Sequence, residues 1–387
     1  MASEDIIVYL DAMENTVNMI RGDGSDKRTL FSTGCACPDG IALGLSNYRD
    51  TRDPKDIVVW WGNMGPMKPS PGRGDGGDWH EADGFLSRGM LLGGDVTVQR
   101  VEVTAPRHLV CGTAEYRTPG HHPLITTVKQ LCITHDENSI FFCDREGHGL
   151  KKYNVSTGEV VLLLSSDALA PPQRATPGGA GASSEGPHCE EECRFCVGVA
   201  LDERRDQIVF TLKGPPKGGK GRLLTAPYGF RRRNLPSNTA AKTSVAEGVI
   251  DPQTAVSALE SQPEPVDLLL DAEESYLYWT DRGDPKAGGN SLNRCFFSHD
   301  YRTGQLQLGG KELVMSGFDE PIGLGWAASL WNRIPLPASS KETLRKYMYV
   351  TDKCHLWRCD LQSGTKVSIF DCSPHNRPTG LVVLRFI

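Results

Sequence analysis

The stretch Tyr276-Leu-Tyr-Trp-Thr-Asp281 decides the fold, because it is an apolar, β-strand-like run that ends in an aspartate. Related runs occur at five other places along the chain, so the pattern repeats about six times. These runs are residues 6–11, 57–62, 140–144, 208–212 and 347–352. Four of the six end in aspartate, at Asp11, Asp144, Asp281 and Asp352.

Two further strand patterns complete each repeat. A second strand ends at a turn glycine, as at Gly158 and Gly364, where a positive φ suits a hairpin tip. Another apolar strand follows, and it usually begins at a proline or glycine. Six four-stranded units without intervening helical patterns predict an all-β protein, a six-bladed β-propeller. The chain begins in the aspartate-bearing strand and ends in the strand that normally precedes it, so the C-terminal strand should complete the N-terminal blade.

The repeats are spaced more widely than a minimal blade requires, and the surplus predicts one domain, residues 1–387, with long loop insertions. These insertions are residues 64–95, 166–188, 214–262 and 327–345. Loops on a rigid scaffold often carry binding groups. We expect 64–95 and 327–345, which contain aromatic residues, to cover a pocket. The Pro/Gly/Ala/Ser-rich segment 166–188 is expected to be disordered.

Composition excludes several functional classes. The 387 residues are 39% hydrophobic, which is enough for a sizeable core. With 42 basic and 48 acidic residues the net charge is −6, so neither nucleic acid nor an anionic membrane is an expected partner. No apolar stretch approaches the roughly 20 residues that span a bilayer, and the start of the chain is acidic, unlike a signal peptide. A soluble, cytoplasmic protein is expected.

The motif Tyr278-Trp-Thr-Asp281 resembles the signature of the YWTD family of six-bladed propellers, and residues 11–43 follow the whole repeat of that family. The resemblance implies the propeller fold. Extracellular YWTD propellers bind protein partners, and the related gluconolactonase and NHL propellers are hydrolases or scaffolds. The sequence is also similar to intracellular fungal propellers of meroterpenoid pathways, which promote hetero-Diels–Alder coupling of a tropolone quinone methide with a humulene-type alkene.

This second resemblance implies a cofactor-independent enzyme of secondary metabolism with a terpenoid or polyketide-derived small-molecule substrate. Such an enzyme holds two partners together and polarises the carbonyl of the heterodiene. The predicted catalytic residues are Arg145, Glu146, Lys353 and His122. The predicted substrate-binding residues, at the channel mouth or in an aromatic wall, are Trp61, Asn63, Trp79, His148, Glu264, Arg282, Glu320, Trp331 and Arg377. At least one member of the Trp60-Trp61 pair should instead pack between blades.

Two alternative functions stay open. One is a non-catalytic propeller that binds a ligand or a protein, and the other is a metal-dependent lactonase or hydrolase. The predicted mouth mixes carboxylates with cations, which suits an anionic or hydrogen-bonding organic ligand better than a divalent ion. We therefore predict no metal and no cofactor. The sequence has no Gly-x-Ser-x-Gly or His-Glu-x-x-His motif.

Two motifs point to other chemistry. Cys189, Cys193 and Cys196 have the spacing of the cluster-binding loop of radical SAM enzymes, and with His188 they also suggest zinc. Both interpretations lack the expected structural context, so reduced structural cysteines are favoured. The recurring aspartates look catalytic, but repetition in most blades indicates that they accept hydrogen bonds from backbone donors of the neighbouring blade.

Overall fold

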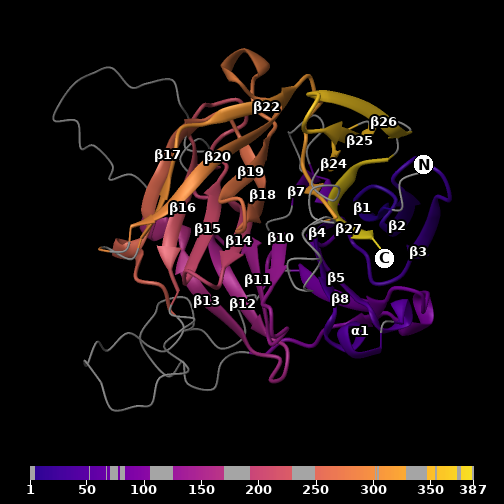
Figure 1. Cartoon of the computed structure of the whole chain (residues 1–387). Helices are drawn as coiled ribbons and strands as arrows, with labels where there is room; N and C mark the ends of the chain where they lie inside the picture. Colours follow the sequence, from indigo (N-terminus) through magenta and orange to yellow (C-terminus); the bar gives the residue numbers. More distant parts are fainter. Residues whose placement is uncertain are drawn as a thin grey trace.

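The computed structural model describes thirteen segments of the chain and arranges six β-sheets around a common axis (Figure 1). The described residues are 5–51, 53–66, 68–69, 77–78, 83–104, 125–169, 192–228, 249–300, 302, 305–327, 347–353, 355–372 and 376–385. Within them, the only α-helix is the short α1 (Ser46–Thr51). The prediction of an all-β, six-bladed propeller is confirmed.

Each sheet forms one blade, and we number the blades in chain order. Blade 1 contains β27 (Pro378–Arg385), β1 (Asp5–Asp11), β2 (Thr16–Arg21) and β3 (Arg28–Phe31). Blade 2 contains β4 (Pro38–Gly44), β5 (Val58–Asn63), β8 (Phe85–Met90) and β9 (Gln99–Arg100). Blade 3 contains β10 (Val128–Ile133), β11 (Ser139–Asp144), β12 (Gly149–Asn154) and β13 (Val160–Ser165).

The remaining blades follow the same order from the axis outward. Blade 4 contains β14 (Cys196–Asp202), β15 (Gln207–Leu212), β16 (Gly221–Pro227) and β17 (Val256–Gln262). Blade 5 contains β18 (Pro265–Asp271), β19 (Tyr276–Asp281), β20 (Ser291–Asp300) and β21 (Gln305–Leu308), and β22 (Glu312–Ser316) also pairs with β20. Blade 6 contains β23 (Leu324–Gly325), β24 (Tyr347–Thr351), β25 (His355–Asp360) and β26 (Thr365–Asp371).

The ring closes where the first and last described strands pair, as predicted. In Figure 1 the indigo β1 lies beside the yellow β27, and the two strands are antiparallel, with Ile7 opposite Val383. Arg385 Nε donates to the Asp5 carboxylate at 2.6 Å, and Tyr349 of blade 6 donates to the other oxygen of the same group at 2.7 Å. Blade 1 is therefore assembled from both ends of the chain.

The segments predicted as insertions contain strands, which corrects part of the sequence interpretation. Residues 214–262 include β16 and β17, and residues 64–95 include β8. The outermost strand β17 exposes several polar residues, so its sequence resembles that of a loop. The strands β8 and β16 are mostly buried, but each lies next to a polar or glycine-rich segment. Most of 166–188 and of 327–345 lies outside the described residues.

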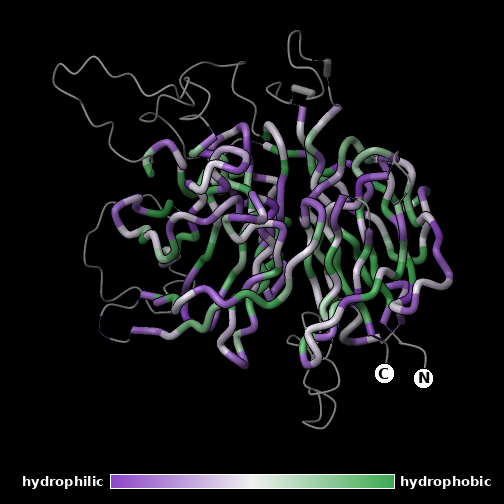
Figure 2. Tube along the Cα trace, turned by 90° about the horizontal axis from the view of Figure 1, so that it is seen from above, coloured by the Kyte–Doolittle hydropathy of each residue, from purple (hydrophilic) through white to green (hydrophobic). Residues whose placement is uncertain are grey.

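Hydrophobic side chains on neighbouring blades pack together to form the core. The ring of Trp61 in blade 2 stacks on Phe31 in blade 1, with centroids 5.1 Å apart, and its Nε1 donates to the Gly34 carbonyl at 3.0 Å. Trp60 is buried as well. Figure 2 shows hydrophobic residues along the strands and hydrophilic residues at many of the turns. The strand pattern in the sequence thus reflects packing between blades.

The inner strands share a β-bulge, and at this level they approach one another closely around the axis of the ring. In five blades the register with the second strand shifts between the first and fourth residues of the inner strand, as between Pro38 and Ile41. In blade 6, where β23 is short, we count these positions from Pro321, the residue equivalent to Pro38. The third residue is then glycine in four blades, at Gly40, Gly198, Gly323 and Gly380. A Cβ at any of these glycines would lie 2.1–2.4 Å from a backbone oxygen of the adjacent blade. We call this level of the axis the waist, and Gln130 and Asp267 occupy the third position in the other two blades.

The recurring aspartates are structural, but their donors differ from the prediction. Each accepts hydrogen bonds from the loop that enters the inner strand of its own blade, rather than from a neighbouring blade. Asp144, for example, accepts from the backbone N–H groups of Thr126 and Thr127, both at 2.8 Å. Asp281 accepts from Glu264 at 2.9 Å and from Gly283 at 3.1 Å. The aspartate therefore fixes the entry of the chain into each inner strand.

Replacing Asp281 with alanine should destabilise the protein by about 1–3 kcal/mol, because two buried backbone N–H groups lose their acceptor. Chemical unfolding monitored by intrinsic fluorescence measures this loss. An Asp281→Ala variant as stable as the wild type would contradict the structural role.

The Asp281→Asn variant should reveal that the stability of the wild-type protein depends on pH. Burial raises the pKa of Asp281 to about 6, and its Oδ2 has no hydrogen-bond partner among the residues that the structure describes. The folded state therefore holds the proton more tightly than the unfolded state, whose pKa is 3.8. Ionisation of Asp281 therefore lowers the stability of the wild-type protein by about 3 kcal/mol as the pH rises from about 4 to 6. The substituted asparagine does not ionise, so the stability of the variant relative to the wild type should rise over that pH range. Parallel unfolding titrations measure this difference in the free energy of unfolding, and a difference that stays constant with pH would refute the effect.

Candidate functional site in the central channel

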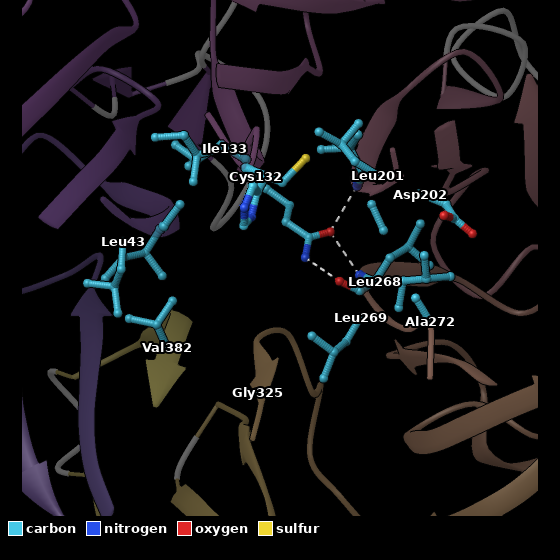
Figure 3. Close-up of a pocket in the computed structure, with 18 of the residues that line it drawn as sticks. Leu43, Cys132, Ile133, Leu201, Asp202, Leu268, Leu269, Ala272, Gly325 and Val382 are labelled. Atoms are coloured by element: carbon cyan, nitrogen blue, oxygen red, sulfur yellow. Dashed lines mark hydrogen bonds between the residues drawn. The ribbon is translucent and has the colours of Figure 1, made fainter. Parts of the chain in front are cut away.

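The inner strands of all six blades surround a cavity of about 510 Å³ at the ring axis. The cavity lies beyond the waist, toward the ends of the inner strands, and we call it the chamber. Its walls come from the fourth to sixth residues of these strands, and Figure 3 shows Leu43, Cys132, Leu201, Leu269 and Val382 around the space. Polar residues occur where the lining reaches the strand ends, namely His135, Asp202, Glu203, Arg204 and Glu273. The chamber is thus an apolar space with a polar rim.

The chamber exists because the fifth residue of most inner strands is small. The six residues at this level are Ala42, Cys132, Ala200, Leu269, Gly325 and Val382. Small side chains at one level leave the axis unfilled, while the bulge brings the same strands together at the waist. The position of the cavity therefore follows from strand register as well as from residue size.

Gln130, at the level of the waist, forms a polar floor of the chamber. Its Oε1 accepts from the backbone N–H groups of Val199 at 2.9 Å and Leu268 at 2.8 Å (Figure 3). Its Nε2 donates to the Leu268 carbonyl at 2.7 Å, which leaves a second N–H without a partner among the described residues. The side chain from blade 3 thus joins blades 4 and 5. The sequence interpretation missed Gln130, although its substitution for the recurring glycine was a detectable signal.

Charged side chains gather on the other side of the waist, where inner strands begin and second strands end. We call this group the charged mouth, and it consists of Asp39, Lys129, Arg145, Glu146, Lys213, Glu264, Arg282, Glu320 and Arg377. Lys213 Nζ and Arg282 Nε contact the same oxygen of Glu264, at 2.9 and 2.7 Å. Arg145 pairs with Glu146 and Lys129 with Asp39, and Arg377 contacts Glu320 at 3.4 Å. Ion pairs therefore cross between blades around this end of the channel.

Burial and neighbouring charges shift several pKa values at the charged mouth. Burial, assisted by the charges of Arg282 and Arg145, lowers the pKa of Lys213 to about 8, against the opposing effect of Glu264. Burial alone would raise the pKa of Glu146, but Arg145 overrides it and the pKa falls below its ordinary value. Glu146 is therefore ionised near neutral pH.

Asp267, at the waist, has a carboxyl group whose pKa is raised. Burial raises its pKa well above the ordinary value, the nearby charge of Asp39 raises it further, and Lys129 opposes the shift. The side chain is almost completely buried. The sequence interpretation missed Asp267, Asp39, Lys129 and Lys213, because nothing in their local sequence marks them as facing the axis.

The structure brings six of the predicted site residues together at the charged mouth: Arg145, Glu146, Glu264, Arg282, Glu320 and Arg377. Lys353 is exposed, and its backbone N–H donates to Asp319. His148 Nδ1 lies 3.2 Å from Asp167, and its ring packs against Phe195. His122, Trp79 and Trp331 lie outside the described residues.

Two predicted substrate-binding residues are instead structural. Trp61 is fully buried between blades 1 and 2 and cannot form a pocket wall. Asn63 is also fully buried, and its Oδ1 accepts from the Ala36 N–H at 2.9 Å. Its Nδ2 donates to the Phe85 carbonyl at 3.3 Å. Asn63 takes the place of the blade aspartate, because its side chain fixes the same kind of loop.

Signs of metal or hydrolase chemistry are weak in the described part of the chain. No three His, Cys, Asp or Glu side chains there form a group that could hold a metal ion. Cys196 Sγ lies 2.8 Å from Cys143 Sγ in the core, and Cys189 is outside the described residues. Asp371 and Ser368 both approach Nδ1 of His355, at 2.9 and 3.5 Å, whereas a catalytic triad uses both ring nitrogens.

No described helix is long and apolar enough to cross a membrane.

The six sheets and the axial chamber define a six-bladed β-propeller with a ligand-sized cavity. No family model matches the chain. A protein of the fungus Pyricularia oryzae named low-density lipoprotein receptor-related protein 1 is 27% identical over 367 residues, 95% of this chain and 92% of that protein. The 3-hydroxyacyl-CoA dehydrogenase-like protein LAM1 of Cochliobolus heterostrophus is 27% identical over 356 residues, 90% of this chain. The match covers 56% of LAM1, so this chain spans only about half of that relative.

A solved structure supports the fold. A chain in the crystal structure of the nidogen/laminin complex superimposes with a TM-score of 0.54 at 11% identity, and the match covers 98% of both chains. At this identity the likeness concerns the fold alone. Together with the motif Tyr278-Trp-Thr-Asp281, these findings support a propeller of the YWTD type.

Proposed function

We propose that the protein is a cofactor-independent small-molecule enzyme of secondary metabolism, and that its chamber binds an apolar, terpenoid-derived molecule. The observation that carries the proposal is the chamber itself. Its volume of about 510 Å³ falls within the range of small-molecule sites, roughly 300–1,000 Å³, and its walls are mostly aliphatic. Both sequence relatives are fungal proteins, which agrees with an origin in fungal secondary metabolism.

The proposed reaction is the hetero-Diels–Alder coupling of a tropolone-type quinone methide with a terpene alkene. One C–C bond and one C–O bond form together, and every atom of both partners stays in the product. The protein needs to hold the partners in a reactive pose and to place a hydrogen-bond donor on the heterodiene carbonyl. The second Nε2–H of Gln130 is a suitable donor, because Gln130 lines the chamber and two other blades hold its amide in place.

Narrowing the chamber should strongly reduce this coupling activity. The Val382→Phe variant adds an aromatic ring at the wall level and should reduce turnover at least about tenfold, because it removes space that the substrate needs. The assay incubates a quinone methide precursor with a humulene-type alkene and compares product rate and stereochemistry with and without protein. The matched control is Val367→Phe, at a valine that is 54% exposed on the outer strand β26, and this variant should behave like the wild type.

Racemic product at the uncatalysed rate with wild-type protein would eliminate the catalytic proposal. The second candidate is a non-catalytic carrier of an apolar ligand, favoured by the scarcity of polar groups inside the chamber. A carrier would bind the terpene partner without turnover, and Val382→Phe would still weaken that binding.

A further inference from the structure

The guanidinium group of Arg282 is held at one edge and open at the other. Its Nε donates to Glu264 Oε1 at 2.7 Å, and its side chain is 22% exposed. Neither Nη1 nor Nη2 donates a hydrogen bond to a described residue, although the charges of Glu320 and Asp39 also act on the guanidinium and help to raise its pKa. Because a guanidinium carries five N–H donors, the two Nη groups keep four donors that no described residue uses. The Glu264 carboxylate thus fixes the orientation of Arg282 and leaves its forked end available.

Lys213 lies on the same side of Glu264 and has donors to spare. Its Nζ contacts the same Oε1 atom at 2.9 Å and uses one of its three N–H bonds there. One carboxylate therefore serves two cations, and Arg145 is close enough to affect the titration of Lys213. The charged mouth as defined has five cations and four carboxylates, whereas the whole chain has a net charge of −6. The charged mouth as a whole thus has one more cation than carboxylates.

We propose that the charged mouth is a second binding site, which takes an organic carboxylate on the open fork of Arg282 with support from Lys213. The planar fork matches the two oxygens of a carboxylate, and a charge-assisted bidentate pair is stronger than a neutral contact. Partial burial strengthens it further, because fewer water molecules screen the charges. The ring centroid of Phe195 lies 5.9 Å from Lys213 Nζ, so an aromatic surface stands beside this cation.

This carboxylate site is distinct from the chamber. The waist lies between them, where the inner strands approach one another at the glycine positions and Gln130 bridges three blades. The proposal therefore goes beyond the proposed function and does not depend on it. A variant that narrows the chamber should leave the carboxylate site intact.

The test uses benzoate as the probe and benzamide as its uncharged analogue, each titrated into the full chain and followed by ligand-observed NMR. Benzoate should bind with a dissociation constant of about 1 mM, as expected for a ligand of this size, and benzamide should bind at least about tenfold more weakly. In Arg282→Lys, which keeps the positive charge beside Glu264 but lacks the fork, benzoate affinity should fall about tenfold. The matched control is Arg294→Lys, at a half-buried arginine on β20 that pairs with Glu312, and it should not change the affinity.

Chamber variants separate this proposal from the proposed enzyme activity. Benzoate should bind Val382→Phe as it binds the wild type, whether or not the coupling reaction is observed. Equal binding of benzoate and benzamide to the wild type would overturn the carboxylate site, and this comparison needs no variant to fold. Unchanged benzoate affinity in a folded Arg282→Lys protein would also overturn it.

Discussion

A chain that ends at Thr379 should fail to close its ring and should lose most of its cooperative unfolding transition. Deleting residues 380–387 removes most of β27, the strand that pairs with β1 and lines the axis. Leu381, Val383 and Leu384 are buried, and each buried aliphatic side chain contributes about 1.5–3 kcal/mol. Their sum is comparable to the total stability of a typical domain, roughly 5–15 kcal/mol.

The measurement is thermal unfolding followed by circular dichroism, with a second truncated chain as the control. A chain that ends at Arg385 keeps every residue of β27 and the ion pair between Arg385 and Asp5, so it should melt like the full chain. An unchanged melting temperature in the shorter chain would show that the terminal strand does not hold the ring together.

The Gln130→Leu variant should lose at least about 3 kcal/mol of stability. Leucine has a similar size, but it leaves the Val199 N–H, the Leu268 N–H and the Leu268 carbonyl without their partner. A buried polar group without a partner costs about 1–3 kcal/mol. Because the same amide is the proposed donor in the chamber, any residual coupling activity should also fall.

The control for this substitution is Gln307→Leu on the exposed face of β21. Chemical unfolding of both variants measures the difference, and the Gln307 variant should stay within about 0.5 kcal/mol of the wild type. Equal stability of the two variants would show that the amide of Gln130 does not join blades 3, 4 and 5.

The fold could be predicted because its signal is local and repeated. Apolar runs such as Tyr276–Asp281 mark the second strand of each blade, and six copies leave few architectures open. The outermost strand β17 was harder to recognise, since it carries exposed polar residues, and the largely buried β16 was interpreted as part of the same loop because polar segments surround it. A strand with one exposed face lacks the continuous hydrophobic run that identifies an inner strand.

The charged mouth could be predicted in part, because charges that directly follow or precede repeated strands must lie on one face of the ring. Arg145, Glu264 and Arg282 were found in this way. Lys129 and Asp267 were not, since each lies inside an inner strand, where the direction of the side chain depends on the bulge. Trp61 was misassigned because an aromatic residue looks the same in sequence whether it faces a ligand or another blade.

By itself the sequence determined the number of sheets, the order of strands and the closure of the ring by its last strand, because each depends on contacts that repeat along the chain. Only the tertiary structure decided where the channel is open. The chamber depends on small residues at one level of six separate strands, and the waist depends on glycines that let backbones of adjacent blades approach within contact distance. Those relations involve residues as far apart as Asp39 and Gly380, and no local pattern records the distance between them.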